Sequence, residues 1–501
     1  MSVYGEFFTK FMSPFFEGLA NIFKELFKGL AQMFNVLNYV DVISQYSSSL
    51  KGFGIVILIF SIIFLLFVIA LVCFIVYRLV KTYLRYRRNV RKEDQLIEEI
   101  ESLNNDIVKL KKQNEKISEL TNSEGEIELD EEGKPVNVLK DGESRFFKLS
   151  NVDKKYEGKE PETITNSYTL EEFCDLFRNY SASKLKLYYD INLIRLFIAS
   201  LASNKLIILE GISGTGKTSL AYAFGSMIDN ETTVASVQPS WRDSTEIFGY
   251  FNEFTKRFNE TEILAKMYEA LYTDEVYVTL LDEMNISRVE YYFAEMLSIL
   301  ELPNKKDWVV ELVPNVWDND PVKLDNGKLT VPENMWYIGT INNDDSTFMI
   351  TDKVYDRAMP IAIDDKCEAF EAPETECLKL SFKYLMEQFD KASQEHAVKQ
   401  ENLDKIAEMD RYVIDHFRLA FGNRIVKQLK EFVPAYIACG GDEIAGIDYL
   451  IAHKILRKFE QLNLAYIKDE IDGFIEYLEK LFGEGKMPEC KAYLLRLKKT
   501  I

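Results

Sequence analysis

The sequence has few of the residues that hold transition metals. Only three of its 501 residues are histidine, and its six cysteines form no CxxC pair. These residues are scattered along the chain: Cys73, Cys174, Cys367, Cys377, Cys439, Cys490, His396, His416 and His453. Because zinc sites need such ligands at close and regular spacing, the sequence offers neither a structural nor a proteolytic zinc site. It gives no sign of a nucleophilic serine or cysteine, and its cysteines indicate reduced thiols in a cytosolic environment.

The chain also lacks an excess of basic residues. It carries 60 Lys and Arg against 80 Asp and Glu, a formal net charge of −20. Broad binding to nucleic acid needs clustered cations that displace counterions, so this balance argues against it, although a local basic patch stays open. The length allows two or three structural units, and no internal repeat is visible.

Residues 1–77 contain two apolar segments. Phenylalanine and leucine recur at spacings of three and four within residues 1–38, which predicts a helix with one apolar face inside an N-terminal segment 1–52. Such a face suits either the membrane boundary or a contact between subunits. Residues 53–77 contain no charge, and as a helix they would span about 37 Å, against a hydrocarbon core of about 30 Å. We therefore expect a transmembrane helix there.

The charges around this run predict its orientation. Only Lys51 closely precedes it, whereas seven basic residues closely follow it: Arg78, Lys81, Arg85, Arg87, Arg88, Arg91 and Lys92. Positive charge is enriched on the cytoplasmic side of membrane spans. The sequence therefore predicts a single-pass protein of the cell membrane, with residues 1–52 outside and the large C-terminal part in the cytoplasm.

Residues 78–120 combine this basic segment with a heptad pattern. Between residues 93 and 120, apolar side chains alternate by four and three, as in the a/d seam of a coiled coil, and Asn114 takes an a position. The alternative is an amphipathic stalk packed on its own domain. Residues 121–165 are polar and acidic, which predicts a linker with a small hairpin near Gly133.

The strongest local signal is a glycine-rich loop between a strand and a helix. Residues 206–210 (LIILE) form a short apolar run, and residues 211–218 (GISGTGKT) match the pattern GxxxxGK[ST] before a helical pattern resumes. In this pattern backbone N–H groups surround phosphates, the Lys217 side chain reaches the β- and γ-phosphates, and the Thr218 hydroxyl binds Mg²⁺. The residues expected to bind nucleotide are Gly211, Ser213, Gly214, Thr215, Gly216, Lys217, Thr218 and Ser219.

A second apolar run ends in two carboxylates. Residues 276–281 are apolar and rich in β-branched side chains, and Asp282 and Glu283 follow directly, about 65 residues after the glycine loop. A carboxylate at the carboxyl end of a strand can hold Mg²⁺, and the next one can polarise an attacking water. We therefore expect Asp282 to bind Mg²⁺ with Thr218, and Glu283 to act as the catalytic base. The alternative is an ordinary strand end.

Two further polar residues follow a third apolar run, residues 336–340. Asn342 could orient the water or the γ-phosphate as a sensor, although NNDDS is also good turn chemistry. Arg357 lies shortly after, and its guanidinium could act as an arginine finger on the γ-phosphate of a neighbouring subunit. The alternative for Arg357 is a structural salt bridge with Asp352 or Asp356.

Taken in order, these motifs resemble the AAA+ ATPases of the McrB-type branch, which is related to the dynein-like and MoxR-like families. The segment LDEMNISRVEYYFAEMLSILE (residues 281–301) is similar to the family pattern DEINRANxSKVFGELLxLLE, and VPENMWYIGTIN (residues 331–342) is similar to PENxxIIGTMN. The resemblance covers roughly residues 190–460. It implies an α/β nucleotide-binding domain over residues 166–365, followed by a helical lid and C-terminal helices over residues 366–501.

The resemblance also implies roles for residues outside these motifs. SVQPSWRDSTEIFGYF looks like the family segment that carries pore-facing loops, which makes Phe248, Tyr250 and Phe251 candidates for gripping a partner; core aromatics are an equal alternative. FGNRIVKQLKEF looks like part of the helical lid, which makes Arg424 a candidate second sensor.

Two departures separate the chain from the restriction-type McrB proteins. Their MNTADRS is INNDDST here, which keeps Asn342 and Asp345 and loses the arginine, and their RRRF cluster is DRAM, which leaves Arg357 alone. The membrane anchor and stalk stand where those proteins have a DNA-reading module. The departures leave the choice between ATP and GTP, and any partner nuclease, unassigned.

Together these patterns predict an α/β P-loop NTPase of the AAA+ class, with a parallel sheet flanked by helices and a C-terminal helical lid, preceded by a transmembrane helix and a coiled coil. The expected function is hydrolysis of ATP, or of GTP, with Mg²⁺ in a homo-oligomeric ring that remodels or translocates an unidentified protein partner at the membrane. The alternatives are a nucleotide-gated membrane scaffold or switch, and the motor subunit of a McrB-like phage-defence system with a separate nuclease.

Overall fold

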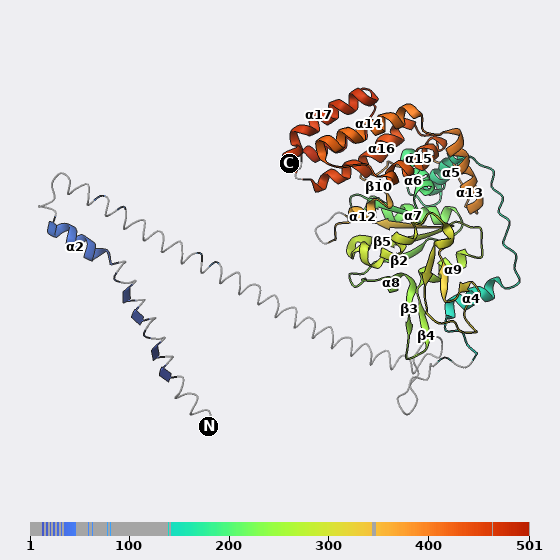
Figure 1. The fold of residues 1–501 in the computed structure, drawn as a ribbon, viewed down its shortest axis with the longest axis horizontal. Helices are drawn as coiled ribbons and strands as arrows, with labels where there is room; N and C mark the ends of the chain where they lie inside the picture. The colour runs from blue at the N-terminus through green and yellow to red at the C-terminus, as the bar shows by residue number, and fades with distance from the viewer. Residues whose placement is uncertain are drawn as a thin grey trace, which may run out of the picture. The chain divides into compact units, whose positions relative to one another are not determined.

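The computed structural model describes residues 142–342, 347–462 and 464–499, together with residues 35–46, Leu139 and scattered positions between Ser13 and Lys81 (Figure 1). The chain divides into two compact units, Met1–Glu126 and Ile127–Ile501. Most of the described residues belong to the second unit.

The described part of the first unit contains the helix α2 (Val36–Tyr46). The expected apolar helix within residues 1–38 is described only at scattered positions. Almost all of the expected transmembrane run 53–77, and all of the expected coiled coil 93–120, lie outside the described residues. Among the residues that the structure does describe, no helix is both long and apolar enough to cross a membrane.

The second unit is built on a five-stranded parallel sheet with the strand order β10-β1-β9-β5-β2. The strands are β1 (Leu206–Glu210), β2 (Thr233–Ser236), β5 (Tyr277–Asp282), β9 (Met335–Thr340) and β10 (Ala358–Ala362). The apolar runs that predict strands in the sequence are β1, β5 and β9, the three central strands. They are buried along almost their whole length because helices cover both faces of the sheet. The parallel sheet flanked by helices confirms the expected α/β fold.

Each face of the sheet carries its own core. Alternate residues of a strand point to opposite faces, so Ile207 joins Phe224 on one face, whereas Ile208 joins Met267 and Tyr292 on the other. The helices over the first face are α5 (Leu170–Ser183), α6 (Ile191–Ser203) and α7 (Lys217–Met227). Those over the second face are α8 (Thr245–Phe248), α9 (Glu262–Ala270), α10 (Val289–Tyr292) and α11 (Ala294–Ile299).

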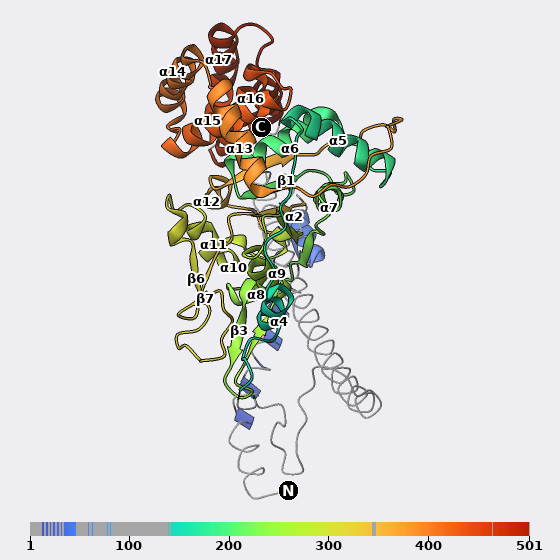
Figure 2. The same cartoon turned by 90° about the vertical axis from the view of Figure 1, so that its right-hand side faces the viewer.

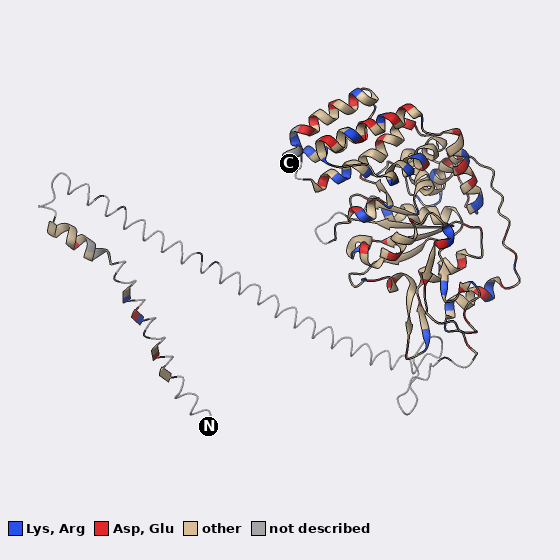
Figure 3. Ribbon diagram, viewed as in Figure 1, with Lys and Arg blue, Asp and Glu red and all other residues tan. Residues whose placement is uncertain are grey.

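The chain after β10 forms a helical bundle. Its helices are α13 (Phe382–Glu395), α14 (Gln400–Phe417), α15 (Asn423–Ala438), α16 (Glu443–Leu450), the π-helical turn η3 (Ile451–Ile455), the 3-10 helix η4 (Leu456–Gln461), α17 (Leu464–Phe482) and α18 (Pro488–Lys499). Phe432 and Ile447 share a core with the first face of the sheet, so the bundle packs directly on the α/β layers. Figure 3 shows acidic and basic residues interspersed along α14 and α17.

A β-hairpin projects from the opposite end of the second unit. Its strands are β3 (Gly249–Asn252) and β4 (Arg257–Glu260), and beside it lies a small sheet of β6 (Val309–Glu311), β7 (Leu324–Asp325) and β8 (Lys328–Thr330). Figures 1 and 2 both show this hairpin and the helical bundle at opposite ends.

Part of the expected acidic linker is docked against this end of the fold. The helix α4 (Phe147–Tyr156) packs on α9. Just before it, Arg145 makes two hydrogen bonds of 2.9 and 2.7 Å to the carboxylate of Asp320, and its guanidinium lies 4.4 Å from the ring centre of Trp317. Both side chains of this ion pair are almost fully buried. Residues 145–156 are therefore an integral part of the domain, whereas the expected hairpin near Gly133 lies outside the described residues.

Candidate functional site

The glycine-rich loop, residues 211–216, joins the end of β1 to the start of α7, as the sequence predicts. Gly211, Gly214 and Gly216 have φ angles of +141°, +79° and +96°, a region that side chains with a Cβ atom rarely enter. The loop ends at Lys217, whose Nζ donates hydrogen bonds to the carbonyl oxygens of Gly211 at 2.9 Å and of Ile212 at 2.8 Å. Burial lowers the pKa of Lys217, and Asp364 and Asp282 oppose that shift.

Gly211 is required by a close backbone approach. A Cβ atom at this position would lie 2.3 Å from the carbonyl oxygen of Ile363, the residue after β10. The N–H of Ile363 in turn donates to the Glu210 carbonyl oxygen at 2.7 Å. The loop is therefore fixed against the carboxyl end of the neighbouring strand.

The two predicted magnesium ligands meet at this edge of the sheet. Thr218 Oγ1 donates a hydrogen bond of 2.8 Å to Asp282 Oδ1. Thr340, the last residue of β9, donates a second bond of 2.8 Å to the same oxygen, and its Oγ1 accepts the backbone N–H of Glu283 at 2.8 Å. Because β9 lies beside β5, Thr340 holds both Asp282 and Glu283 to the end of β9. Thr340 is a site residue that sequence reasoning missed; its signal is a hydroxyl at the end of an otherwise apolar strand.

Glu283 and Asn342 lie beside this carboxylate. Glu283 is exposed and has a φ of +52°, a left-handed conformation that is uncommon for a residue other than glycine and that clusters at functional sites. Asn342 Nδ2 donates to Glu283 Oε1 at 3.4 Å, so the structure brings the expected base and the expected sensor together. Asn285 Nδ2 donates to the backbone carbonyl of Asn342 at 2.9 Å and fixes the end of β9. Asp345 lies outside the described residues.

The oxygen atoms at this edge fit a magnesium ion that arrives with a phosphate ligand. Mg²⁺ keeps several waters and needs only one or two protein oxygens, and the Thr218 hydroxyl and Asp282 carboxylate provide them 2.8 Å apart. No group of three or more His, Cys, Asp or Glu residues within residues 142–342, 347–462 and 464–499 could hold a metal alone.

Arg357 lies at the amino ends of the parallel strands, opposite the carboxyl ends where the glycine loop lies. It directly precedes β10, whose first residue, Ala358, pairs with Leu206, the first residue of β1. The glycine loop follows the far end of β1, about 13 Å away for four residue steps of about 3.3 Å. The guanidinium of Arg357 therefore cannot reach the glycine loop of its own chain while it keeps its present contacts.

Those contacts differ from the salt bridge considered in the sequence analysis. Arg357 Nε lies 2.5 Å from Glu301 Oε2, and its NH1 donates to the Lys353 carbonyl oxygen at 2.8 Å. Its ion-pair partner is therefore Glu301, not Asp352 or Asp356.

Arg424, the second residue of α15, joins the same carboxylate. Its NH2 lies 2.5 Å from Glu301 Oε1, and its NH1 lies 4.0 Å from Asp356 Oδ2. The structure thus brings Arg424 to Arg357 at the amino edge of the sheet, and it does not bring Arg424 to the glycine loop.

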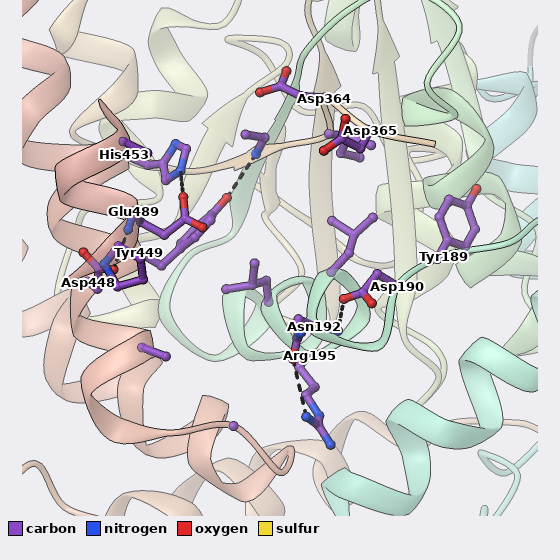
Figure 4. A pocket seen from close by; sticks show the side chains of 18 of the residues that line it. Tyr189, Asp190, Asn192, Arg195, Asp364, Asp365, Asp448, Tyr449, His453 and Glu489 are labelled. Carbon is purple, nitrogen blue, oxygen red and sulfur yellow. Dashed lines mark hydrogen bonds and ion pairs between the residues drawn. The ribbon is translucent and has the colours of Figure 1, made fainter. Parts of the chain in front are cut away.

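A cavity of about 990 Å³ opens beside the glycine loop (Figure 4). Thr215 of the loop lines it, and so do Tyr189 and Asp190 just before α6. Tyr189 donates a hydrogen bond of 3.4 Å to the Gly216 carbonyl oxygen, which ties the wall of the cavity to the loop. The volume lies within the range of pockets for small molecules and cofactors.

The helical bundle forms the opposite wall of the cavity. Figure 4 shows His453 and Glu489 pointing toward each other across from Asp190 and Arg195. The ring of His453 stacks on that of Tyr449 at 4.3 Å between centres. Burial would lower the pKa of His453, but hydrogen bonds and charges of Glu210 and Glu489 raise it above its usual value. Sequence reasoning missed these residues because they come from segments far apart in the chain.

The aromatic residues considered for gripping a partner divide into two groups. Phe248 is 4 % exposed and belongs to the core, and the ring of Phe251 packs edge-on against Trp317. Tyr250, in contrast, is 52 % exposed, and Phe254 at the tip of the β3–β4 hairpin is 86 % exposed. Phe248 and Phe251 therefore pack in the domain. The two exposed aromatic residues are Tyr250, which the sequence predicts as a candidate, and Phe254, which sequence reasoning missed.

No family model matches the chain, and no curated protein matches it significantly.

Proposed function

We propose that this chain is a Mg²⁺-dependent nucleoside triphosphatase of the AAA+ class, working as a homo-oligomer at a membrane. The observation that carries the proposal is the arrangement of Thr218, Asp282, Glu283 and Asn342 beside the glycine loop, at the carboxyl edge of three adjacent strands. Ligands of open α/β sheets bind at this edge.

The residues of the site then have the following roles. Lys217 exchanges its two loop carbonyl partners for β- and γ-phosphate oxygens, and the backbone N–H groups of the loop hold the same phosphates. Thr218 and Asp282 would hold Mg²⁺, which would supply positive charge against the phosphates. Glu283 accepts a hydrogen bond from the attacking water and polarises it, and Asn342 orients that water or the γ-phosphate.

The cavity supports binding of the rest of the nucleotide. Thr215 of the glycine loop lines it together with Tyr189 and Tyr449, aromatic residues of the kind that line small-molecule pockets. ATP is the proposed substrate, and GTP is the alternative that the experiment below includes.

The position of Arg357 supports an oligomeric enzyme. Because it lies across the sheet from the glycine loop of its own chain, the proposed arginine finger acts on the nucleotide of a neighbouring subunit, as in a ring. The exposed Tyr250 and Phe254 are the proposed contacts for a protein partner. The membrane location rests on residues 53–77 and the basic residues that follow them.

The proposal is tested with the full-length protein and the variant Glu283→Gln. Binding of fluorescent ATP and GTP analogues is measured by anisotropy, and turnover is measured by phosphate release. Glu283→Gln is expected to bind nucleotide as the wild type does and to lose turnover by about 10²–10⁴-fold, because it removes a general base. Glu231→Gln, a change of the same kind in the exposed loop before β2, is the matched control and should leave both unchanged. Full turnover in Glu283→Gln would refute its role.

A further inference from the structure

One segment of the helical bundle, residues 453–458, contacts the carboxyl end of β1 and the amino end of the neighbouring strand β10. We term it the basic segment. It runs from the π-helical turn η3 into the 3-10 helix η4. π-Helical turns are rare in proteins overall, and those that occur are often at functional sites. It carries two pairs of basic side chains, each four residues apart: His453 with Arg457, and Lys454 with Lys458.

The first pair contacts the base of the glycine loop. Glu210, which directly precedes Gly211, has a side chain only 10 % exposed. Arg457 NH1 donates to its Oε2 at 2.9 Å, and His453 Nδ1 lies 3.9 Å from its Oε1. Burial would raise the pKa of Glu210, but His453 and Arg457 lower it below its usual value. The loop is therefore joined to the bundle through a charged carboxylate.

The second pair contacts the backbone around Arg357. Lys454 is almost fully buried, and its Nζ donates to the carbonyl oxygens of Tyr355 at 2.8 Å, Asp356 at 3.3 Å and Ala358 at 2.6 Å. These carbonyls lie on both sides of Arg357. Lys458 Nζ adds an ion pair of 2.8 Å to the Asp356 carboxylate. The bundle therefore fixes the backbone from which Arg357 projects.

Tyr355 belongs to both sets of contacts. Its hydroxyl donates to Glu210 Oε2 at 3.0 Å, the guanidinium of Arg457 lies 3.4 Å from its ring centre, and its carbonyl accepts from Lys454. A movement of Glu210 with the glycine loop would thus reach Tyr355 directly, and Tyr355 is two residues from Arg357.

We infer that Lys454 is a positioning residue for Arg357, and that the basic segment couples the glycine loop of one subunit to the arginine that this subunit offers to its neighbour. The inference rests on the proposed NTPase function and on Arg357 acting between subunits. A lesion in Lys454 should therefore leave its own nucleotide site intact and impair the adjacent one.

The test compares hydrolysis by full-length wild type, Lys454→Met and the control Lys468→Met, which changes an exposed lysine on α17. Lys454→Met is expected to lower kcat at least tenfold and to change KM less than threefold. The reason is that an arginine finger contributes about 10³–10⁵-fold to kcat, whereas the nucleotide itself is bound by the residues of the neighbouring subunit. Lys458→Gln, at a more exposed position, should give a smaller fall of kcat in the same direction. Lys468→Met should match the wild type.

Mixed oligomers distinguish a positioning role from a general structural one. Subunits with Lys454→Met keep Glu283, and subunits with Glu283→Gln keep Arg357 and Lys454. A mixture of the two should therefore regain activity above either alone, whereas Lys454→Met mixed with Arg357→Ala should not. Recovery in the second mixture, or none in the first, would overturn the inference. A wild type without any hydrolysis would instead remove the proposed function itself.

The contact at the glycine loop is tested with Arg457→Gln. If the basic segment carries the coupling, wild-type hydrolysis depends cooperatively on nucleotide concentration, and Arg457→Gln lowers the Hill coefficient toward 1. An equally steep curve in Arg457→Gln would contradict the coupling.

Discussion

Thr218 and Asp282 are 64 positions apart in the chain, yet Thr218 Oγ1 donates a 2.8 Å hydrogen bond to Asp282 Oδ1. The hydroxyl lies in the first turn of α7 and the carboxylate at the end of β5, and β9 separates β5 from the strand that leads into α7. Their contact therefore depends on the register of three strands. It joins the two sequence motifs on which the proposed chemistry depends.

Thr340→Val tests the residue that holds the two carboxylate residues of the second motif to the end of β9. The substitution keeps the shape of the side chain, but it removes the donor to Asp282 and the acceptor of the Glu283 N–H. We expect turnover to fall by about 10–100-fold with little change in nucleotide affinity, and stability to fall by about 0.5–1.5 kcal/mol per bond because two partly buried hydrogen bonds are lost. Thr330→Val, at an exposed position of β8, should change neither property. Unaltered turnover in Thr340→Val would show that Thr340 does not position the carboxylates.

Gly211→Ala tests the approach of β10 to the glycine loop. The new Cβ would meet the Ile363 carbonyl oxygen at 2.3 Å, and the φ of +141° is strained for alanine. We expect a loss of at least about 1–3 kcal/mol in the free energy of unfolding, together with weaker nucleotide binding. Gly422→Ala is the control, because the methyl group that it adds would have no atom within 4 Å and the φ of −76° at this position suits any residue. Urea denaturation measures the free energy of unfolding of both variants, and equal values for Gly211→Ala and Gly422→Ala would contradict the expected clash.

Phe248→Ala and Phe254→Ala test which aromatic residues of the hairpin region are structural. Phe248 is 4 % exposed, so its truncation should cost about 3–5 kcal/mol of folding free energy. Phe254 is 86 % exposed, so its truncation should change stability by less than about 0.5 kcal/mol. Urea denaturation of both variants decides the point. A large loss in Phe254→Ala would mean that its ring is buried in the assembled protein.

His453→Gln tests the charged contacts beside the cavity. The pKa of His453 is raised above its usual 6.5 in the folded protein, because Glu210 and Glu489 outweigh the effect of burial. The folded state thus binds the proton more tightly than the unfolded chain. The stability that His453 contributes is complete below about pH 6.5 and is lost as the pH rises through the folded-state value.

The wild type should therefore exceed His453→Gln in free energy of unfolding most clearly near pH 6 and least near pH 9. Urea denaturation across this range measures the difference. The change of this stability difference with pH should be smaller in a Glu489→Gln background, which removes one of the two carboxylates beside His453. A difference that is independent of pH would contradict the arrangement.

The sequence was sufficient for the parts of the fold that depend on local patterns. The runs LIILE, YVTLLD and MWYIGT became the central strands because each is apolar enough to be buried on both faces. The position of the glycine loop between a strand and a helix was predicted from its pattern of glycines, Lys217 and Thr218. The structure brings Asn342 beside Glu283 because both follow neighbouring parallel strands.

Other parts depend on contacts that no local pattern encodes. The pairing of Arg357 and Arg424 with Glu301 joins three segments, and only their packing determines which carboxylate lies nearest. The burial of Phe248 and the exposure of Phe254 depend on how the short hairpin meets its neighbours. Residues 145–156 resembled a polar linker because a few separate contacts dock their start, namely the Arg145–Asp320 ion pair and the buried side chains of Phe146 and Leu149, and not a long apolar run.

The central claim is tested most directly by nucleotide hydrolysis with the full-length protein. Turnover of ATP and of GTP is measured for the wild type, Lys217→Ala and Arg357→Ala. The account predicts Mg²⁺-dependent hydrolysis by the wild type, loss of nucleotide binding and turnover in Lys217→Ala, and loss of turnover with retained binding in Arg357→Ala. Hydrolysis that survives in Lys217→Ala, or a wild type that neither binds nor hydrolyses either nucleotide, would contradict it.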